Sequence, residues 1–340
     1  MKKLTGLMAL AAGVAFSALA GAQTNSIATG GTGGVYYPLG GGVAAVLSKV
    51  PGMQATAEVT GGSVANMQLI GTGKPYIAFT QADAAIDALK GLDKFAGKPI
   101  PVRTIAVLYP NRMHVVSIEG TGVTKIADMK GKRVSTGSGG SATEVFGFRV
   151  IEAAGLDKDK DMRRERLGVA ESVNALKDRK IDAFFWVGGL PTAAVTDLAN
   201  SPGVKIRMID IAHLVPEMEK KYGNIYVKDV IPQRMYNGMA ADNQAATVTN
   251  LLAVHASMDD KTVYTIIKTL WENRVDLVRV HAEAVNIKPE NQRAANSSIP
   301  WHPAALKYFS EVGINVMGAG AAAAKVTDTG AKKADKAVKK

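Results

Sequence analysis

Glycine- and serine-rich loops are the residues of this sequence best suited to chemistry. They occur at residues 30–34, 61–63, 137–141 and 188–189, and each follows an apolar strand-like segment and precedes a helical pattern. Helix N-termini carry unpaired backbone N–H groups and a partial positive charge, so they bind anions such as carboxylate or phosphate. Glycine also lets a ligand approach the backbone closely. The four loops indicate convergence on one small anionic ligand, and tight turns with helix caps are the alternative reading.

Three segments resemble enzyme motifs only in part. Residues 137–142 fit a dinucleotide fingerprint, but the acidic residues that should follow about 20 positions later lie in a charged loop without a preceding strand. Residues 91–98 resemble a P-loop, with Pro99 in place of the magnesium-binding Ser or Thr. Residues 61–65 lack the last Gly of a nucleophile elbow. No general-base constellation accompanies these segments, so we expect a binding protein without cofactor or metal. A nucleotide-dependent α/β enzyme is the alternative.

The segments that must position these loops alternate short apolar strands with amphipathic helices. This order predicts an α/β fold with mostly parallel sheets flanked by helices. The strands are expected at 26–29, 56–59, 76–79, 104–108, 114–118, 133–136, 181–187 and 247–254, and the helices at 39–51, 64–70, 83–90, 141–155, 172–179 and 263–270.

The order of strand, glycine-rich loop and helix occurs in both halves of the chain, which predicts two similar lobes. Extended connections near Tyr109 and Thr247 suggest that the chain crosses between the lobes twice. We therefore expect one lobe from residues 23–111 and 247–317 and the other from residues 112–246. Two crossings of this kind permit hinge closure around a ligand.

Composition sets limits on the class of protein. The 340 residues suggest about two domains, and the 47% hydrophobic share is enough for sizeable cores. The absence of cysteine excludes disulfides and thiolate metal sites. The formal net charge of +11 falls to +5 once two leader lysines and the net +4 from residue 325 onward are removed. Because the remaining basic residues alternate with acidic ones, we expect no nucleic-acid partner.

The two ends of the chain differ from its body. Residues 1–22 combine a basic start, an apolar run and an Ala-Gly-Ala cleavage site, which is the pattern of a cleaved signal peptide. Residues 318–340 are rich in Lys and Ala and are expected to be disordered. Export without lipid attachment or disulfides indicates a periplasmic protein.

The first loop and its surroundings, Ile27–Gly40, read IATGGTGGVYYPLG and resemble the N-terminal signature of the TAXI family. These are periplasmic substrate-binding proteins of tripartite ATP-independent periplasmic (TRAP) transporters. Further resembling segments follow in order at 60–66, 81–83, 108–110, 135–144, 184–191 and 270–273. The resemblance implies a two-lobed periplasmic binding protein fold of type II-like architecture with the ligand cleft between the lobes. It also implies a monomer that delivers a small organic acid, such as glutamate or 2-oxoglutarate, to the membrane permease subunits of a TRAP transporter.

The same resemblance implies ligand contacts from both lobes. They are Gly33, Val35, Tyr36, Ser63 and Gln81 in the first lobe, and Ser138, Ser141, Thr143, Trp186 and Gly189 in the second. Each has a plainer alternative: Tyr36 and Trp186 as core residues, Ser63 and Ser141 as helix caps, and Gln81 as the end of a strand. No arginine lies inside the glycine-rich loops, and the sequence does not place Arg112 or Arg149 relative to them. A periplasmic sensor module is a further alternative function.

Overall fold

The structure is a computed structural model that describes residues 23–318. The predicted signal peptide at 1–22 and all but the first residue of the predicted tail lie outside the described residues. Within the described range, no helix is both long enough and apolar enough to cross a membrane.

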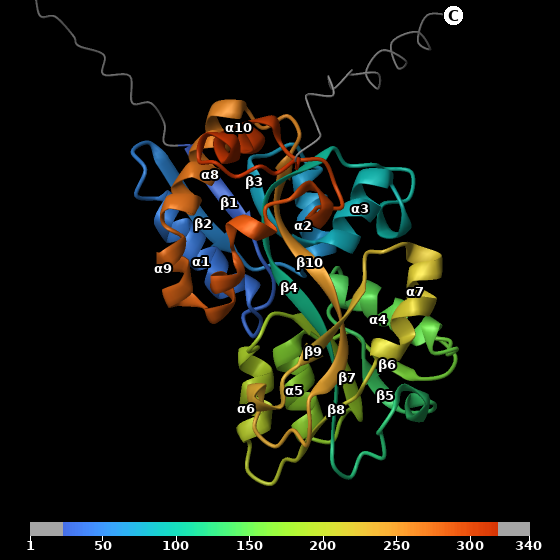
Figure 1. Ribbon diagram of the computed structural model, residues 1–340. Coiled ribbons are helices and arrows are strands. Elements are labelled where there is room, and N and C mark those ends of the chain that lie inside the picture. Colours follow the sequence, from blue (N-terminus) through green and yellow to red (C-terminus); the bar gives the residue numbers. More distant parts are fainter. Residues whose placement is uncertain (1–22, 319–340) are drawn as a thin grey trace, which may run out of the picture.

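The described chain folds into two lobes (Figure 1). Strands and helices alternate in both of them, which confirms the predicted α/β class. The first lobe contains strands β1 (Gln23–Ala28), β2 (Met53–Glu58) and β3 (Tyr76–Gln81) with helices α1 (Tyr36–Leu47), α2 (Ser63–Ile70), α3 (Ala82–Lys90), α8 (Asp260–Glu272), α9 (Arg274–Val280) and α10 (Pro303–Glu311). The second lobe contains strands β5 (Arg133–Ser135), β6 (Arg163–Glu165), β7 (Ala183–Gly188), β8 (Ile206–Met208) and β9 (Val227–Ile231) with helices α4 (Ala142–Ala153), α5 (Val169–Lys177), α6 (Ala193–Asn200) and α7 (Val215–Tyr222).

Two long strands, β4 (Val102–Ile118) and β10 (Asn243–His255), run from one lobe into the other (Figure 1). They pair antiparallel to each other from Thr247 opposite Arg112 to His255 opposite Val102. In the first lobe, β10 also pairs with β3. In the second lobe, β4 pairs with β7 and β10 pairs with β9. The two strands therefore join the sheets of both lobes in one hydrogen-bonded path with the order β2-β1-β3-β10-β4-β7-β5-β6.

The prediction of two strands separated at Tyr109-Pro110 is wrong, because β4 is continuous through this point. Pro110 stands opposite Thr249, and the register between β4 and β10 shifts immediately afterwards, between Thr249 and Leu251. Proline cannot donate a ladder hydrogen bond, so inside a sheet it is confined to edges and bulges. The bulge absorbs the proline without ending the strand.

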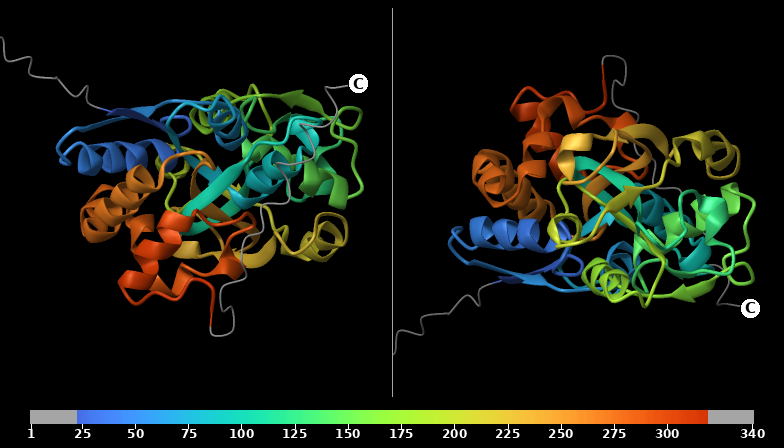
Figure 2. Two further views of the ribbon diagram at one scale, coloured as in Figure 1. Left: turned by 90° about the horizontal axis from the view of Figure 1, so that it is seen from above. Right: turned by 90° about the horizontal axis from the view of Figure 1, so that it is seen from below.

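Apart from these crossing strands, the lobes have the parallel sheets that the sequence predicts. In the first lobe β1 pairs parallel with β2 and β3, and in the second β5 pairs parallel with β6 and β7. The late helices α8 and α9 pack against α1, so segments from the beginning and the last part of the chain lie side by side in the first lobe (Figure 2). This arrangement places the β–α loops of both lobes opposite each other.

A histidine buried in the second lobe makes stability depend on pH. His114 of β4 is fully buried, with Nδ1 at 2.9 Å from the Arg112 carbonyl oxygen and Nε2 at 2.9 Å from the Tyr236 hydroxyl. Burial lowers the pKa of His114 to about 4, compared with 6.5 in the unfolded chain. Below pH 6.5 the unfolded state therefore binds a proton that the folded state excludes, and stability falls as the pH drops from 6.5 toward 4.

We expect His114 to account for about 2 kcal/mol of the stability lost between pH 7.5 and pH 5. His114→Gln carries no titrating group, so its free energy of unfolding should fall by that much less over the same interval. Urea denaturation of both proteins at the two pH values measures the difference, and the other histidines are common to both. Equal losses in the two proteins would contradict the prediction.

Candidate functional site

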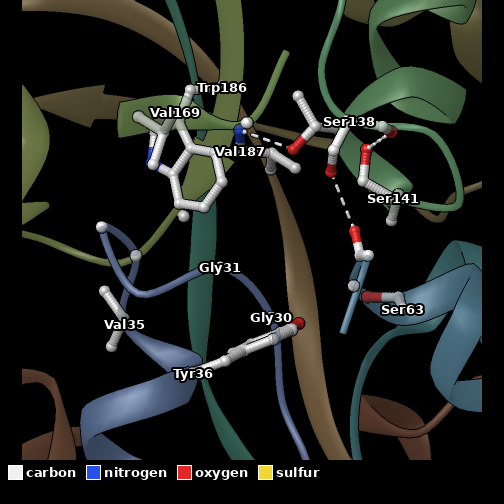
Figure 3. A pocket seen from close by; sticks show the side chains of 18 of the residues that line it. Gly30, Gly31, Val35, Tyr36, Ser63, Ser138, Ser141, Val169, Trp186 and Val187 are labelled. Atoms are coloured by element: carbon white, nitrogen blue, oxygen red, sulfur yellow. Dashed lines mark hydrogen bonds between the residues drawn. The ribbon is translucent and has the colours of Figure 1, made fainter. Parts of the chain in front are cut away.

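A cavity of about 350 Å³ lies between the two lobes. Nine of the ten residues predicted as ligand contacts line it, namely Gly33, Val35, Tyr36, Ser63, Gln81, Ser138, Ser141, Thr143 and Trp186. Figure 3 shows Val35, Tyr36 and Ser63 from the first lobe facing Trp186, Ser138 and Ser141 from the second. The structure therefore brings together residues that are more than 100 positions apart in the sequence.

Tyr36 begins α1 at the first-lobe wall of the cavity. Its hydroxyl donates a hydrogen bond to Asn250 Oδ1 of β10, and its ring lies 5.2 Å from the ring of Phe79. Burial raises the pKa of Tyr36 above its ordinary value, so the side chain stays a neutral phenol. Tyr36 thus has both of the roles weighed from the sequence: it packs against the core and it lines the cavity.

The loop at 60–63 is fixed by the buried side chain of Asn66 in α2. Its Nδ2 donates to the carbonyl oxygens of Thr29 and Phe79, at 2.7 Å each, and its Oδ1 accepts from the Thr60 hydroxyl at 2.6 Å. Gly62 follows with a φ of +113°, which favours glycine. Ser63 then starts α2, and its hydroxyl accepts a hydrogen bond from the backbone N–H of Gln81 at 3.2 Å.

On the second-lobe wall the hydroxyl groups are already engaged with the protein. Ser141 caps α4: its Oγ accepts from the Glu144 N–H at 3.1 Å and donates to the Ser138 carbonyl at 2.7 Å. Thr143 Oγ1 accepts from the Val187 N–H at 3.3 Å. The capping alternative for Ser141 therefore holds. The groups that this loop can offer to a ligand are chiefly its backbone N–H donors.

Four helices begin at the cavity: α1 at Tyr36, α2 at Ser63, α4 after its cap Ser141, and α5 at Val169. The first three follow loops singled out in the sequence. The fourth follows a segment that the sequence did not single out. The helix expected at 172–179 starts three residues earlier, and its cap Gly168 lines the cavity. Helix α6, which follows the loop at 188–189, begins only at Ala193. Converging helix N-termini form an anion-binding environment made of backbone donors.

Gly189 is the one predicted contact that does not line the cavity, although its neighbour Gly188 does. A Cβ built on Gly189 would lie 2.7 Å from Glu283 Cγ and 2.9 Å from Tyr109 Cε2. The residue is therefore packed tightly behind the wall, against Glu283 of the first lobe. Trp186 does line the cavity, and its Nε1 donates to Thr192 Oγ1 at 2.9 Å.

Sequence reasoning missed two parts of the lining. Tyr109 and Asn111 come from the bulged part of β4, where consecutive alternate residues share one face. Residues 166–171 come from the segment between β6 and α5, which includes Arg166, and from the first turn of α5. The glycine at 168 before an apolar helical pattern was the available signal for the second part. Tyr109 and Asn111 could have been found only by predicting that β4 is one continuous strand.

Arg166 brings a positive charge to the cavity rim. Its side chain is 55% exposed, and its Nε lies 2.8 Å from Glu144 Oε1. A Cβ on Gly139 would lie 2.9 Å from Arg166 Nη2, so the guanidinium rests on the glycine-rich loop. Neither Arg112 nor Arg149 lines the cavity.

The two lobes touch each other around the cavity. The Ser138 hydroxyl donates to the Gly61 carbonyl at 3.0 Å, the Ala65 N–H donates to the Gly140 carbonyl at 3.0 Å, and the Ala194 N–H donates to the Gly33 carbonyl at 3.3 Å. The glycines at these points have no side chain to hold the backbones apart. The structure is therefore a closed arrangement of the lobes.

A buried ionic cluster also joins the lobes away from the cavity. Arg149 of α4 pairs with Asp87 of α3, with Nη2 at 2.6 Å from Oδ2, and donates to the Tyr226 hydroxyl at 2.8 Å. That hydroxyl donates in turn to Asp83 Oδ2 at 2.9 Å. Arg149 and Asp87 are each 6% exposed. Among residues 23–318, no group of three or more His, Asp or Glu is placed to hold a metal.

Comparison with known proteins identifies the fold. A model of the NMT1-like family matches residues 27–313. The structure of MatC from Rhodopseudomonas palustris with bound malate has a TM-score of 0.55 and 12% identity, over 86% of this chain and 99% of that one. A structure described as a periplasmic transporter has a TM-score of 0.51 and 13% identity, over 77% of this chain and 86% of that one. These likenesses show the two-lobed periplasmic binding protein fold.

Proposed function

The chain belongs to the NMT1-like family, and we propose that it is the periplasmic solute-binding component of a TRAP transporter of the TAXI type. In this role it captures a small organic acid between its lobes and delivers it to the membrane permease subunits. The observation that carries the proposal is the cavity between the lobes, at which four helices from both lobes begin. Such a site binds a carboxylate through fixed backbone donors, and closure removes the ligand from water.

The dimensions of the cavity and the helix N-termini at its walls favour a small dicarboxylate, such as glutamate or 2-oxoglutarate. Its volume of about 350 Å³ lies at the lower end of the range for small-molecule sites. Its two charged lining residues, Arg166 and Glu171, are exposed, and the rest of the lining combines backbone groups, hydroxyls and amides with apolar side chains such as Val187. The cavity of this chain thus suits a ligand with one carboxylate at the helix N-termini and polar groups elsewhere.

We further propose that the lobes comprise residues 23–111 with 247–317, and 112–246, and that they open by bending of β4 and β10 where these strands pass between the lobes. The contacts between the lobes support this proposal, because they are made by the backbones of Gly33, Gly61 and Gly140. Glycine has no side chain that would hinder closure. We also propose that the protein acts as a monomer, which agrees with a cavity whose two walls come from one chain. Light scattering of the purified protein tests this part.

Thermal denaturation with a ligand panel tests the function. A ligand that binds only the folded state stabilises it by RT ln(1 + [L]/Kd), which is about 2.7 kcal/mol at a hundredfold excess over Kd. We expect small dicarboxylates to raise the melting temperature, and neutral diamides of the same length to leave it unchanged. Stabilisation by NAD or NADP, and by no organic acid, would contradict the proposal and favour the enzyme alternative.

The enzyme alternative depends on the loop at 137–141. The sequence analysis missed the strand β6, which follows this loop and ends at Glu165, where a dinucleotide site would need its acidic residue. Glu165 is exposed and does not line the cavity. The binding-protein proposal is therefore the better supported of the two, and the same geometry would serve a periplasmic sensor module.

Arg166→Gln should weaken the binding of a dicarboxylate by roughly fivefold. The effect is modest because the guanidinium is 55% exposed and already pairs with Glu144, and exposed ion pairs contribute about 1 kcal/mol or less. The loss should shrink at high salt, since salt screens exposed charges. Calorimetric titration measures it, with Arg163→Gln as the matched control: Arg163 is an exposed arginine of β6 outside the cavity. Equal affinities in both variants would remove Arg166 from the site.

A further inference from the structure

Three residues of the first-lobe wall have a buried polar atom without a hydrogen-bond partner. They are Gln81 Oε1, the Tyr109 hydroxyl and Asn111 Oδ1. All three residues line the cavity, and each is only 1–3% exposed. We call them the polar floor. Buried polar groups in proteins are nearly always paired, so three unpaired atoms at one cavity wall indicate a missing partner.

The surroundings of the polar floor fix what that partner is. The Asn111 amide is oriented by Asn250, since its Nδ2 donates to Asn250 Oδ1 at 2.8 Å, while Oδ1 remains free. Burial, and then the neighbouring Tyr36 and the Glu283 carboxylate, raise the pKa of Tyr109, so it remains a neutral phenol. The cation at the rim, Arg166, belongs to the opposite lobe. An anionic group would therefore find no positive charge on this wall, whereas a hydrogen-bond donor would find acceptors.

We propose that the polar floor binds a hydrogen-bond donor on the ligand, and that the protein therefore selects hydroxy acids or amino acids over oxo acids and unsubstituted diacids of the same length. This inference rests on the proposed function and assigns the orientation of the ligand. The carboxylate lies at the helix N-termini, and the hydroxyl or ammonium group lies at Gln81, Tyr109 and Asn111.

The donor and acceptor inventory explains the selectivity. An amide oxygen only accepts hydrogen bonds, whereas a phenol hydroxyl both donates and accepts. A ligand ammonium group can donate to both amide oxygens, whereas a ligand hydroxyl can donate to one of them and accept from the Tyr109 hydroxyl. A keto oxygen can only accept, so it leaves both amide oxygens unpaired, and a methylene group leaves all three atoms unpaired. Leaving buried polar groups unpaired is what makes such sites reject ligands that lack the matching group.

The first test is calorimetric titration of the protein with glutarate, 2-oxoglutarate, 2-hydroxyglutarate and glutamate, which share a five-carbon chain with two terminal carboxylates. We expect 2-hydroxyglutarate or glutamate to bind at least about tenfold more tightly than glutarate and 2-oxoglutarate. Equal affinities for all four would overturn this inference and leave the proposed function standing. If the protein binds none of these four compounds and no other organic acid in the panel above, both this inference and the proposed function are wrong.

The second test removes the floor without disturbing the fold. Tyr109→Phe deletes a hydroxyl that has no partner in the described chain, so the ligand-free melting temperature should stay the same or rise. The same variant should reduce the preference for the donor-bearing ligand over glutarate by about tenfold. Gln81→Met, which keeps the length of the side chain but removes its acceptor, should act in the same direction.

Tyr264→Phe is the matched control, because this tyrosine lies on α8 and donates to Glu311 away from the cavity. It should keep the full preference. If both Tyr109→Phe and Gln81→Met retain the wild-type ratio of affinities, the polar floor does not select the ligand and the inference is wrong.

Discussion

Replacing Gly61 with alanine should lower ligand affinity by roughly 100-fold, or about 2.7 kcal/mol. A Cβ on Gly61 would lie 2.6 Å from the carbonyl oxygen of Gly139 in the opposite lobe. Both groups belong to backbones, so no side chain can rotate to relieve the contact, and the lobes must separate. The Ser138–Gly61 hydrogen bond at the same point would be lost with the closed arrangement. The clash exists only between the lobes, so each lobe should fold normally.

Gly41→Ala provides the matched control for this substitution. Gly41 lies on the exposed side of α1, and a Cβ there meets nothing within 4 Å. Alanine at this position should leave the affinity unchanged and raise stability slightly, because alanine is a better helix former than glycine. Titration calorimetry gives both affinities, and small-angle scattering reports whether the ligand still compacts the protein. Wild-type affinity in Gly61→Ala would show that closure at this contact is not needed for binding.

Arg149→Met should cost about 3–5 kcal/mol of stability, because it leaves Asp83 and Asp87 buried without their positive partner. Burial raises the pKa of both carboxyl groups, and Arg149 opposes that rise. Without the arginine the two groups favour protonation more strongly in the folded state. A carboxyl group with a raised folded-state pKa stabilises the fold at low pH and loses that contribution as the pH rises. The deficit of Arg149→Met should therefore be larger at pH 8 than at pH 5.

Chemical denaturation at the two pH values measures this deficit, with Arg279→Met as the control. Arg279 forms an exposed pair with Asp276 on α9, with 76% of its side chain exposed, and its loss should change stability by less than about 1 kcal/mol at either pH. A loss in Arg149→Met as small as in the control would mean that the cluster between α3 and α4 does not hold the lobes together.

The local order of strand, loop and helix was predictable from sequence, because it depends on neighbouring residues. Gly62 and Ser63 signal a turn and a helix start wherever they lie in a fold, and the structure has α2 beginning at Ser63. The start of α5 was missed because its cap is Gly168, which offers no side-chain capping bond, and because the next residue of a common N-cap type, Ser172, comes four residues later. Weak caps displace a predicted boundary in this way.

Interactions between distant segments were beyond the sequence. The bulge that carries β4 through Pro110 depends on its pairing with β10, which lies more than 130 residues later. Arg149 reads as one more charge on a helix, and only the fold places it against Asp87 of the other lobe. The same reason explains Gly189: the family resemblance implied a ligand contact, whereas packing against Glu283 keeps the residue out of the cavity lining.

A crystal structure of the protein grown with the most stabilising organic acid would show whether the cavity between the lobes is the ligand site. We expect one ligand molecule in the cavity between the lobes, with a carboxylate at the N-termini of α1, α2, α4 or α5 and contacts to residues of both lobes. We also expect that the Gly61 and Ser138 contact persists in the complex. A ligand bound outside this cavity, or an empty cavity at a saturating ligand concentration, would show that the cavity is not the binding site.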